Sequence, residues 1–298
     1  GWVRGAFPWR EPGPLEAYDE PDIWQCEFFE WLGHEIALRA FDGVHAVMPI
    51  RGAVSSGHGI GKGALTGMLV SFIMSTRRNA KGVITANTGP QLQDKTWPSI
   101  MTWMKRALTA HWFILNTSIL YRAGHRESWK CSPQTCDPDN SESFAGQHNA
   151  ASTSFYINDE DSNVPDIIHE VQEGGLTDGE PMQFLFGNPT RRRGSFHDIV
   201  FAGDGKRWKT WVIDARTCRF PNKALIAEQL EDWGGEDSDR FRVRVRGIPP
   251  KAEDAQFIDS GRVLEAQKRQ VIVLPDEPLV AGCDLAWGGS DSNVIRFR

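Results

Sequence analysis

A short glycine-rich loop between two apolar segments constrains the fold of this chain most strongly. The apolar stretch 46–56 ends in Gly57-His58-Gly59-Ile60-Gly61-Lys62-Gly63, and a helical pattern follows the loop. Apolar residues recur there at spacings of three and four, as on one face of a helix, at Leu65, Met68, Leu69, Phe72 and Ile73. The sequence therefore predicts the order strand, loop, helix, in which backbone N–H groups of the loop can bind a phosphate.

The loop matches a nucleoside-triphosphate loop only in part. Its alternating glycines permit a tight turn, and Lys62 is placed to neutralise β- and γ-phosphates. The pattern G-x-x-x-x-G-K-[ST] fails twice, because Ser56 replaces the first glycine and Gly63 replaces the Ser or Thr that binds Mg²⁺. A plain glycine turn that caps a helix is the alternative interpretation of the loop taken alone.

Two acidic residues further along the chain favour the nucleotide interpretation. The apolar segment Phe155-Tyr156-Ile157 is a strand candidate that runs into Asp159 and Glu160. A P-loop ATPase places one acid at such a strand end for the Mg²⁺ shell and a second one to orient the attacking water. A solvated strand end also explains the pair by itself. Because loop and acids occur in the right order on the right elements, we predict a site for ATP and Mg²⁺.

Strands and helices alternate along most of the chain. Helical periodicity is expected over 24–38, 92–108 and 165–173, and buried strands are expected over 83–86 and 184–186. This alternation predicts an α/β fold, a three-layer P-loop NTPase with a mostly parallel central sheet.

Composition bounds the class of protein. The 298 residues are 40% hydrophobic and 24% charged, as in an ordinary globular protein, and no apolar run approaches the roughly 20 residues of a membrane span. The N-terminus has no signal-peptide pattern. Five scattered cysteines indicate reduced thiols, and Cys131 and Cys136 lack a second pair at zinc-site spacing. We expect a cytoplasmic protein without a membrane partner. The net charge of −6 argues against extensive DNA wrapping but allows a local basic patch.

Several segments beside the glycine loop carry a more specific signal when they are taken together with it. They are Pro21-Asp22-Ile23-Trp24-Gln25, Thr85-Ala86-Asn87-Thr88, Lys95-Thr96-Trp97-Pro98, Phe144-Ala145-Gly146, Gly187-Asn188-Pro189-Thr190-Arg191 and Val243-Arg244-Val245-Arg246-Gly247. Together they span nearly the whole chain and resemble the large subunits of tailed-bacteriophage terminases. The resemblance implies ATP-driven packaging of double-stranded DNA into a viral procapsid in the host cytoplasm. It also implies a homo-oligomeric ring, a portal protein and a terminase small subunit as partners.

The resemblance implies roles for individual residues. Lys62 would hold the phosphates together with Gly57, His58, Gly59, Ile60, Gly61, Gly63 and Ala64. Gln25 would contact adenine, Asp159 would bind the hydrated Mg²⁺, and Glu160 would orient the catalytic water. Gly187, Asn188, Pro189, Thr190 and Arg192 would form a coupling motif that senses the γ-phosphate. Asp284 and the accessory Asp291 would be metal-binding acids of an RNase H-like nuclease, whose later acids are missing, so no DNA cleavage is expected.

The domain organisation follows from the same resemblance and from composition. Residues 1–23 are rich in Pro, Gly and acidic side chains, and we interpret them as an extended arm. The predicted parts are the arm with a helix on the adenine side (1–45), the ATPase core with its linker subdomain (46–247), a linker (248–275) and the beginning of the nuclease domain (276–298). We expect this last domain to be incomplete, because about twenty residues cannot bury a core.

Three departures and two basic segments leave alternatives open. We expect weak or metal-sensitive ATP hydrolysis because of three departures: Gly63, Asp161 beside the acidic pair, and the incomplete nuclease. Thr66 is a poor substitute for the missing Mg²⁺ ligand. A prophage remnant that binds nucleotide without turnover and a helicase-like ATPase are the alternative functions.

The run 191–193 is either a solvated turn or a phosphate contact. The alternating arginines of 240–246 predict a strand with a basic face, whereas the resemblance suggests a helical region. His169 is expected on a helix surface.

Overall fold

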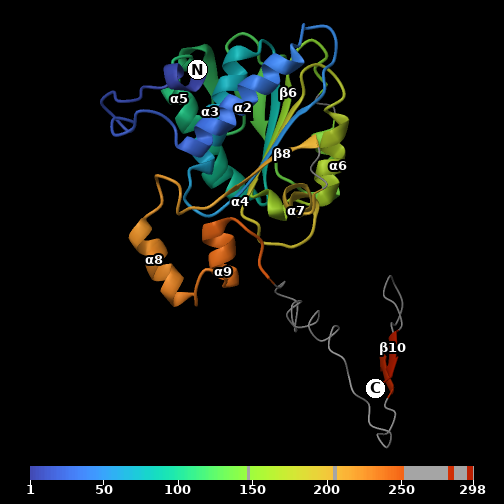
Figure 1. Cartoon of the computed structure of the whole chain (residues 1–298). Helices are drawn as coiled ribbons and strands as arrows, with labels where there is room; N and C mark the ends of the chain where they lie inside the picture. The colour runs from blue at the N-terminus through green and yellow to red at the C-terminus, as the bar shows by residue number, and fades with distance from the viewer. Residues whose placement is uncertain (146–147, 204–206, 252–280, 285–293, 298) are drawn as a thin grey trace, which may run out of the picture. The chain divides into compact units, whose positions relative to one another are not determined.

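The computed structural model describes residues 1–145, 148–203, 207–251, 281–284 and 294–297. The chain divides into two units, Gly1–Asp254 and Ala255–Arg298. The first unit contains an eight-stranded sheet flanked by helices (Figure 1). In the second unit, β9 (Ala281–Asp284) pairs with β10 (Val294–Phe297) as an antiparallel hairpin.

The large sheet is mostly parallel, as predicted. Its strands are β1 (Ile50–Ser56), β2 (Lys81–Ala86), β3 (Phe113–Leu115), β4 (Leu120–Arg122), β5 (Lys130–Pro133), β6 (Ser154–Asp159), β7 (Met182–Gly187) and β8 (Lys209–Ile213). The spatial order is β3-β4-β5-β2-β6-β7-β1-β8, with every pair from β5 to β8 parallel and β3 and β4 antiparallel at one edge. The central strands β6 and β7 are buried along their whole length, which explains their nearly continuous apolar sequences.

The four segments for which the apolar periodicity predicts helices are helical, and further helices occur elsewhere in the chain. The helices are α1 (Trp2–Ala6), α2 (Ile23–Arg39), α3 (Lys62–Thr76), α4 (Gly89–Gln91), α5 (Trp97–Arg106), α6 (Asp166–Gly174), α7 (Ser195–Phe201), α8 (Lys223–Asp232) and α9 (Asp239–Phe241). Two π-helical turns, η1 (Leu92–Thr96) and η6 (Arg242–Arg246), continue α4 and α9. Asp22 caps α2 in a capping box with Gln25, so this helix begins at the residue that follows the cap.

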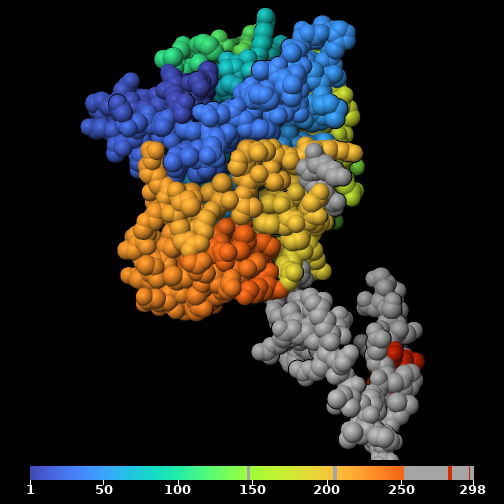
Figure 2. Space-filling model, viewed as in Figure 1, coloured from blue at the N-terminus to red at the C-terminus, as the bar shows by residue number. Residues whose placement is uncertain are grey.

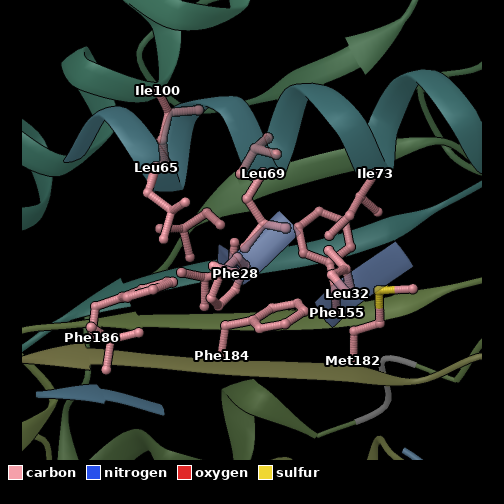
Figure 3. Packing of buried hydrophobic residues seen from close by; sticks show 14 of the residues in the cluster. Phe28, Leu32, Leu65, Leu69, Ile73, Ile100, Phe155, Met182, Phe184 and Phe186 are labelled. Atoms are coloured by element: carbon pink, nitrogen blue, oxygen red, sulfur yellow. The ribbon is translucent and has the colours of Figure 1, made fainter. Parts of the chain in front are cut away.

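Side chains alternate across the sheet and bury both of its faces. On one face, Leu65 and Leu69 of α3 pack on Phe155 and Phe184 from the central strands (Figure 3). On the other face, Tyr156 packs with α6, and Leu185 packs with α7. The fold therefore has three layers, α/β/α, which confirms the predicted fold class.

The prediction of an extended N-terminal arm is wrong. Trp2–Ala6 forms the short helix α1, and Val3, Phe7 and Leu15 are buried in a cluster with Met68 of α3. Figure 2 shows this segment, in dark blue, lying against the body of the unit. The Pro and Gly residues shape turns between apolar anchors, so the segment contributes to the core instead of extending into solvent.

The arginine-rich segment 240–246 is helical, so its interpretation as a strand is wrong and the resemblance indicated its structure correctly. Ser238 caps α9 by accepting a hydrogen bond from the Phe241 N–H. Phe241 and Val245, four residues apart, are the buried positions. A helical spacing of buried apolar residues overrides the local alternation of arginine and valine.

None of the helices in the described part of the chain is long and apolar enough to span a membrane.

Candidate nucleotide site

The predicted site residues meet at the carboxyl ends of three adjacent parallel strands. The glycine loop follows β1, Asp159 ends β6, and Asn188 follows β7. The pairing register places Ser55 beside Gly187 and Asp159 beside Phe186, so these strand ends lie at one edge of the sheet. A cavity of about 440 Å³ opens there, lined by His58, Gly59, Ile60, Gly61, Lys62, Gly63, Gln91, Lys95, Thr96, Ser99, Asp159 and Glu160. Ligands of open α/β sheets bind at this edge.

The loop needs its glycines for two different reasons. Gly59 and Gly61 have φ angles of 74° and 90°, a region that side chains other than glycine rarely adopt. Gly57 lies so close to η6 that a Cβ atom would be 2.4 Å from the Val245 carbonyl oxygen. The His58 N–H donates to the Arg244 carbonyl at 2.7 Å, which holds the start of the loop on η6. The rest of the loop leads into α3, whose first N–H groups have no partner within the helix.

Lys62 connects the loop to the segment after β7. Its Nζ donates to Asn188 Oδ1 at 2.9 Å and to Ser56 Oγ at 3.3 Å. Asn188 is buried, and its Nδ2 donates to the Ser56 carbonyl at 2.5 Å. Ser56, the residue that departs from the phosphate-loop pattern, is therefore bonded to both. The structure thus brings the predicted phosphate-binding lysine and the predicted coupling motif into direct contact.

Asp159 is buried and is oriented by two hydrogen bonds. Thr96 Oγ1 donates to Asp159 Oδ2 at 2.5 Å, and the Glu160 N–H donates to Oδ1 at 3.1 Å. Burial raises the pKa of Asp159, and the neighbouring Glu160 raises it further, against the hydrogen bond from Thr96 and the charge of Lys62. A cation in the cavity would lower the pKa of Asp159 again, because it favours the ionised carboxylate.

Glu160 has a left-handed backbone conformation, with φ 52° and ψ 43°. A non-glycine residue there costs on the order of 1–2 kcal/mol, and such strain concentrates at functional sites. The side chain is half-buried beside the cavity. Carboxylates of Asp159 and Glu160 with the hydroxyls of Thr96 and Ser99 are oxygen donors, the kind that Mg²⁺ prefers, so the residues fit this ion.

Asp161 does not line this cavity. Its carboxylate is buried, accepts a hydrogen bond from Asn158 Nδ2 at 2.8 Å and lies 3.2 Å from His169 Nε2. The placement of His169 on a helix surface is therefore wrong. Burial lowers the pKa of His169, but Asp161 and two further acids outweigh burial and raise it above its ordinary value. A helical pattern cannot reveal such a partner, because Asp161 belongs to the preceding turn.

The remaining predicted residues have separate positions. Gln25 Nε2 donates to the Gly61 carbonyl at 3.0 Å, so α2 supports the loop from behind, where Ala64 also lies. Pro189 is buried, and Thr190 Oγ1 lies 3.0 Å from Ser162 Oγ. Arg192 is exposed and donates to the Lys251 carbonyl instead of reaching the cavity.

Of the two metal-binding acids predicted in the second unit, one lies within the described residues. Asp284 is the last residue of β9, and Asp291 lies outside the described residues. Within the described part of the chain, no group of three or more His, Cys, Asp or Glu side chains could hold a metal ion. Cys131 and Cys136 are buried free thiols.

We expect His58 to be neutral at pH 7. Partial desolvation by the loop and the cations Lys62 and Arg244 lower its pKa from 6.5 to about 4. A folded-state pKa below the unfolded value means that the stability contributed by His58 is present above pH 6.5 and is lost as the pH falls toward 4. An NMR titration, assigned with His58→Gln, should give a midpoint near 4. A midpoint at or above 6.5 would contradict this electrostatic picture.

The comparisons with known proteins find similarity to phage terminases in sequence and in fold. No protein-family model matches the chain. Over 257 residues, 82% of this chain and 52% of the relative, it is 29% identical to a probable terminase large subunit of Enterobacteria phage P7. The chain therefore spans about half the length of this curated relative.

Similar solved structures share the fold. A large terminase from a thermophilic bacteriophage matches with a TM-score of 0.53 and 13% identity, over 79% of this chain and 57% of that one. The HK97 bacteriophage large terminase also gives 0.53 and 13%, over 80% and 54%. The same thermophilic-phage terminase in complex with ATP-γ-S gives 0.50 and 14%, over 80% and 56%.

Proposed function

We propose that this chain, which is similar in sequence to a probable phage terminase large subunit, is the ATPase motor part of such a subunit. It would hydrolyse ATP with Mg²⁺ and use the energy to move double-stranded DNA into a viral procapsid. One observation supports this most directly: Lys62, Asp159 and Glu160 line one cavity at the carboxyl edge of the sheet. The ATP-γ-S complex of the thermophilic-phage terminase supports the choice of nucleotide.

In the proposed reaction each residue has one task. Lys62 and the N–H groups at the start of α3 bind the phosphates. Glu160 orients the attacking water and accepts its proton. Asp159, aligned by Thr96, would hold Mg²⁺ through water, and this ion neutralises phosphate charge when bound. The role of Gln25 at the adenine is likewise a proposal, which its contact with the loop supports.

The link from Lys62 to Asn188 suggests how ATP is sensed. A γ-phosphate competes with Asn188 Oδ1 for the Lys62 ammonium, since both are acceptors for the same donor. When Lys62 turns to the phosphate, Asn188 loses a partner, and the coupling motif Gly187, Asn188, Pro189 and Thr190 with Arg192 can shift. Arg192 already contacts the segment after η6 through the Lys251 carbonyl.

We propose that the α9–η6 segment contacts DNA through Arg240 and Arg244. Both side chains are exposed, whereas Arg242 and Arg246 pair with Asp237 at 3.8 and 3.1 Å. Phosphate contacts of this type carry affinity without sequence preference, as a packaging motor needs. The Arg244 carbonyl also holds the loop, so one segment connects the nucleotide site to the proposed DNA surface.

The remaining assignments concern the whole subunit. A homo-oligomeric ring, a portal protein and a terminase small subunit are the proposed partners, in the host cytoplasm. The proposed parts are the N-terminal segment with α2 (1–45), the ATPase core (46–247), a linker (248–275) and nuclease residues (276–298). Asp284 and Asp291 would be the nuclease acids.

ATP turnover should rise when double-stranded DNA is added.

The affinity of the chain for double-stranded DNA should fall as the salt concentration rises. The double variant Arg240→Gln with Arg244→Gln should flatten the slope of log DNA affinity against log salt concentration by about two. Arg78→Gln with Arg126→Gln removes equal charge from exposed positions elsewhere and should leave the slope unchanged. Preferential stimulation by single strands would favour a helicase-like ATPase. Nucleotide binding without Mg²⁺-dependent turnover would favour a prophage remnant.

A further inference from the structure

Gly63 stands where a phosphate loop carries the Ser or Thr whose hydroxyl binds Mg²⁺. A Cβ atom built on Gly63 would lie 2.9 Å from Ser99 Oγ and 3.5 Å from Ser99 Cβ. The space beside the missing side chain is therefore occupied by a hydroxyl from a different helix, α5. Position 63 carries no hydroxyl, and the Ser99 hydroxyl lies next to the place where a side chain at position 63 would begin.

Glycine at two positions of α3 makes this approach possible. Gly63 and Gly67 are one helical turn apart, and so are Ser99 and Trp103 on α5. A Cβ at Gly67 would lie 2.6 Å from Trp103 Cβ. At both levels α3 contributes no side chain to the contact, so Ser99 and Trp103 of α5 approach its backbone, and the level at Gly63 is the one that faces the cavity.

The Ser99 hydroxyl is free to bind a ligand. Ser99 is half-buried and lines the cavity together with Lys62 and Asp159. Among the residues that the structure describes, its hydroxyl has no hydrogen-bond partner. The neighbouring hydroxyls are already engaged, because Thr96 donates to Asp159 at 2.5 Å and Thr66 donates to the Lys62 carbonyl at 3.1 Å.

We propose that Ser99 supplies the hydroxyl that positions the nucleotide-bound Mg²⁺ in place of residue 63. This inference rests on the proposed function, since it concerns the same ATP site. The alternative is that Gly63 only permits close packing of α3 on α5. That alternative needs a small residue at position 99 but no hydroxyl. Binding of the metal would then join α3 and α5, because the phosphate lysine and the metal hydroxyl come from different helices.

The test measures metal affinity on the full chain with Mn²⁺ as a spectroscopic substitute for Mg²⁺. In the presence of ADP, electron paramagnetic resonance should show about tenfold weaker Mn²⁺ binding to Ser99→Ala, the size of effect typical for residues that orient a bound metal. ADP affinity in EDTA should stay unchanged. Thr102→Ala, which removes an exposed hydroxyl from the same helix, is the matched control and should bind Mn²⁺ normally.

A reciprocal variant separates metal positioning from packing. Gly63→Ser should weaken Mn²⁺ binding, because its Cβ would crowd Ser99 Oγ. Combining it with Ser99→Ala should restore affinity to within about threefold of the parent, since the hydroxyl returns on the other helix. Unchanged Mn²⁺ affinity in Ser99→Ala, with normal ADP binding, would overturn the role of Ser99 alone. Failure of the parent chain to bind ADP at all would overturn the proposed function and this inference with it.

Discussion

Replacing Glu160 with glutamine is expected to lower the rate of ATP hydrolysis about 10²- to 10⁴-fold, the usual contribution of a positioned general base. The amide keeps the shape of the side chain but cannot accept the proton of the attacking water. ATP affinity should change little, because Lys62 and the loop, not Glu160, are placed to bind the phosphates. The measurement is single-turnover hydrolysis beside equilibrium binding of a fluorescent ATP analogue.

Glu170→Gln is the matched control for this variant. Glu170 is an exposed residue of α6 and does not line the cavity, so the same chemical change there should leave turnover unaltered. Turnover of Glu160→Gln within a few-fold of the parent would show that another group activates the water. Loss of ATP binding in this variant would instead assign Glu160 to the binding of nucleotide and metal.

The sequence predicts the sheet and the phosphate loop well for a physical reason. A parallel strand buried on both faces must be apolar throughout, and β6 and β7 show this in Phe155-Tyr156-Ile157 and Phe184-Leu185-Phe186. The residues directly after such strands lie at one edge, so Asp159 and Asn188 can be placed near Lys62 from the sequence. Order along the chain is sufficient for this part of the site.

Contacts between side chains of distant segments cannot be predicted in this way. The bond between Thr96 and Asp159, and the approach of Ser99 to Gly63, depend on how closely α5 packs on α3. Hydroxyl residues are common on helices, and no spacing in the sequence marks the two that face the cavity. Gly67 carries a faint signal, since a glycine inside a helix often permits close packing.

The wrong predictions have a common physical origin. A helical pattern places His169 on a surface because it reports on one element only, whereas the pairing with Asp161 joins two. Local alternation suggests a strand for 240–246, but burial of Phe241 and Val245 selects the helix. In both cases tertiary contacts decide the outcome, and local patterns contain no information about them.

Replacing Lys62 with methionine should weaken ATP binding at least about 30-fold, because removing one partner of a desolvated, hydrogen-bonded charge pair costs about 2–5 kcal/mol. Methionine keeps an unbranched apolar stem and is one atom shorter than lysine, so packing is largely preserved. Isothermal titration with ATP measures the effect, and turnover should disappear with binding. Lys105→Met, an exposed lysine of α5, is the matched control and should bind ATP normally.

The variant Asn188→Ala tests whether the partner of Lys62 is also needed for ATP binding. Lys62 Nζ donates to Asn188 Oδ1, so a γ-phosphate that takes this donor competes with that acceptor. Removing Asn188 therefore leaves Lys62 without this competitor, and ATP affinity should stay the same or rise, while stimulation of turnover by DNA should fall. If Asn188→Ala and Lys62→Met both abolish ATP binding, Asn188 only holds the loop in shape through Ser56. Unchanged or higher ATP affinity in Asn188→Ala, together with weaker stimulation of turnover by DNA, would support a role for Asn188 in coupling the nucleotide site to the proposed DNA-binding segment.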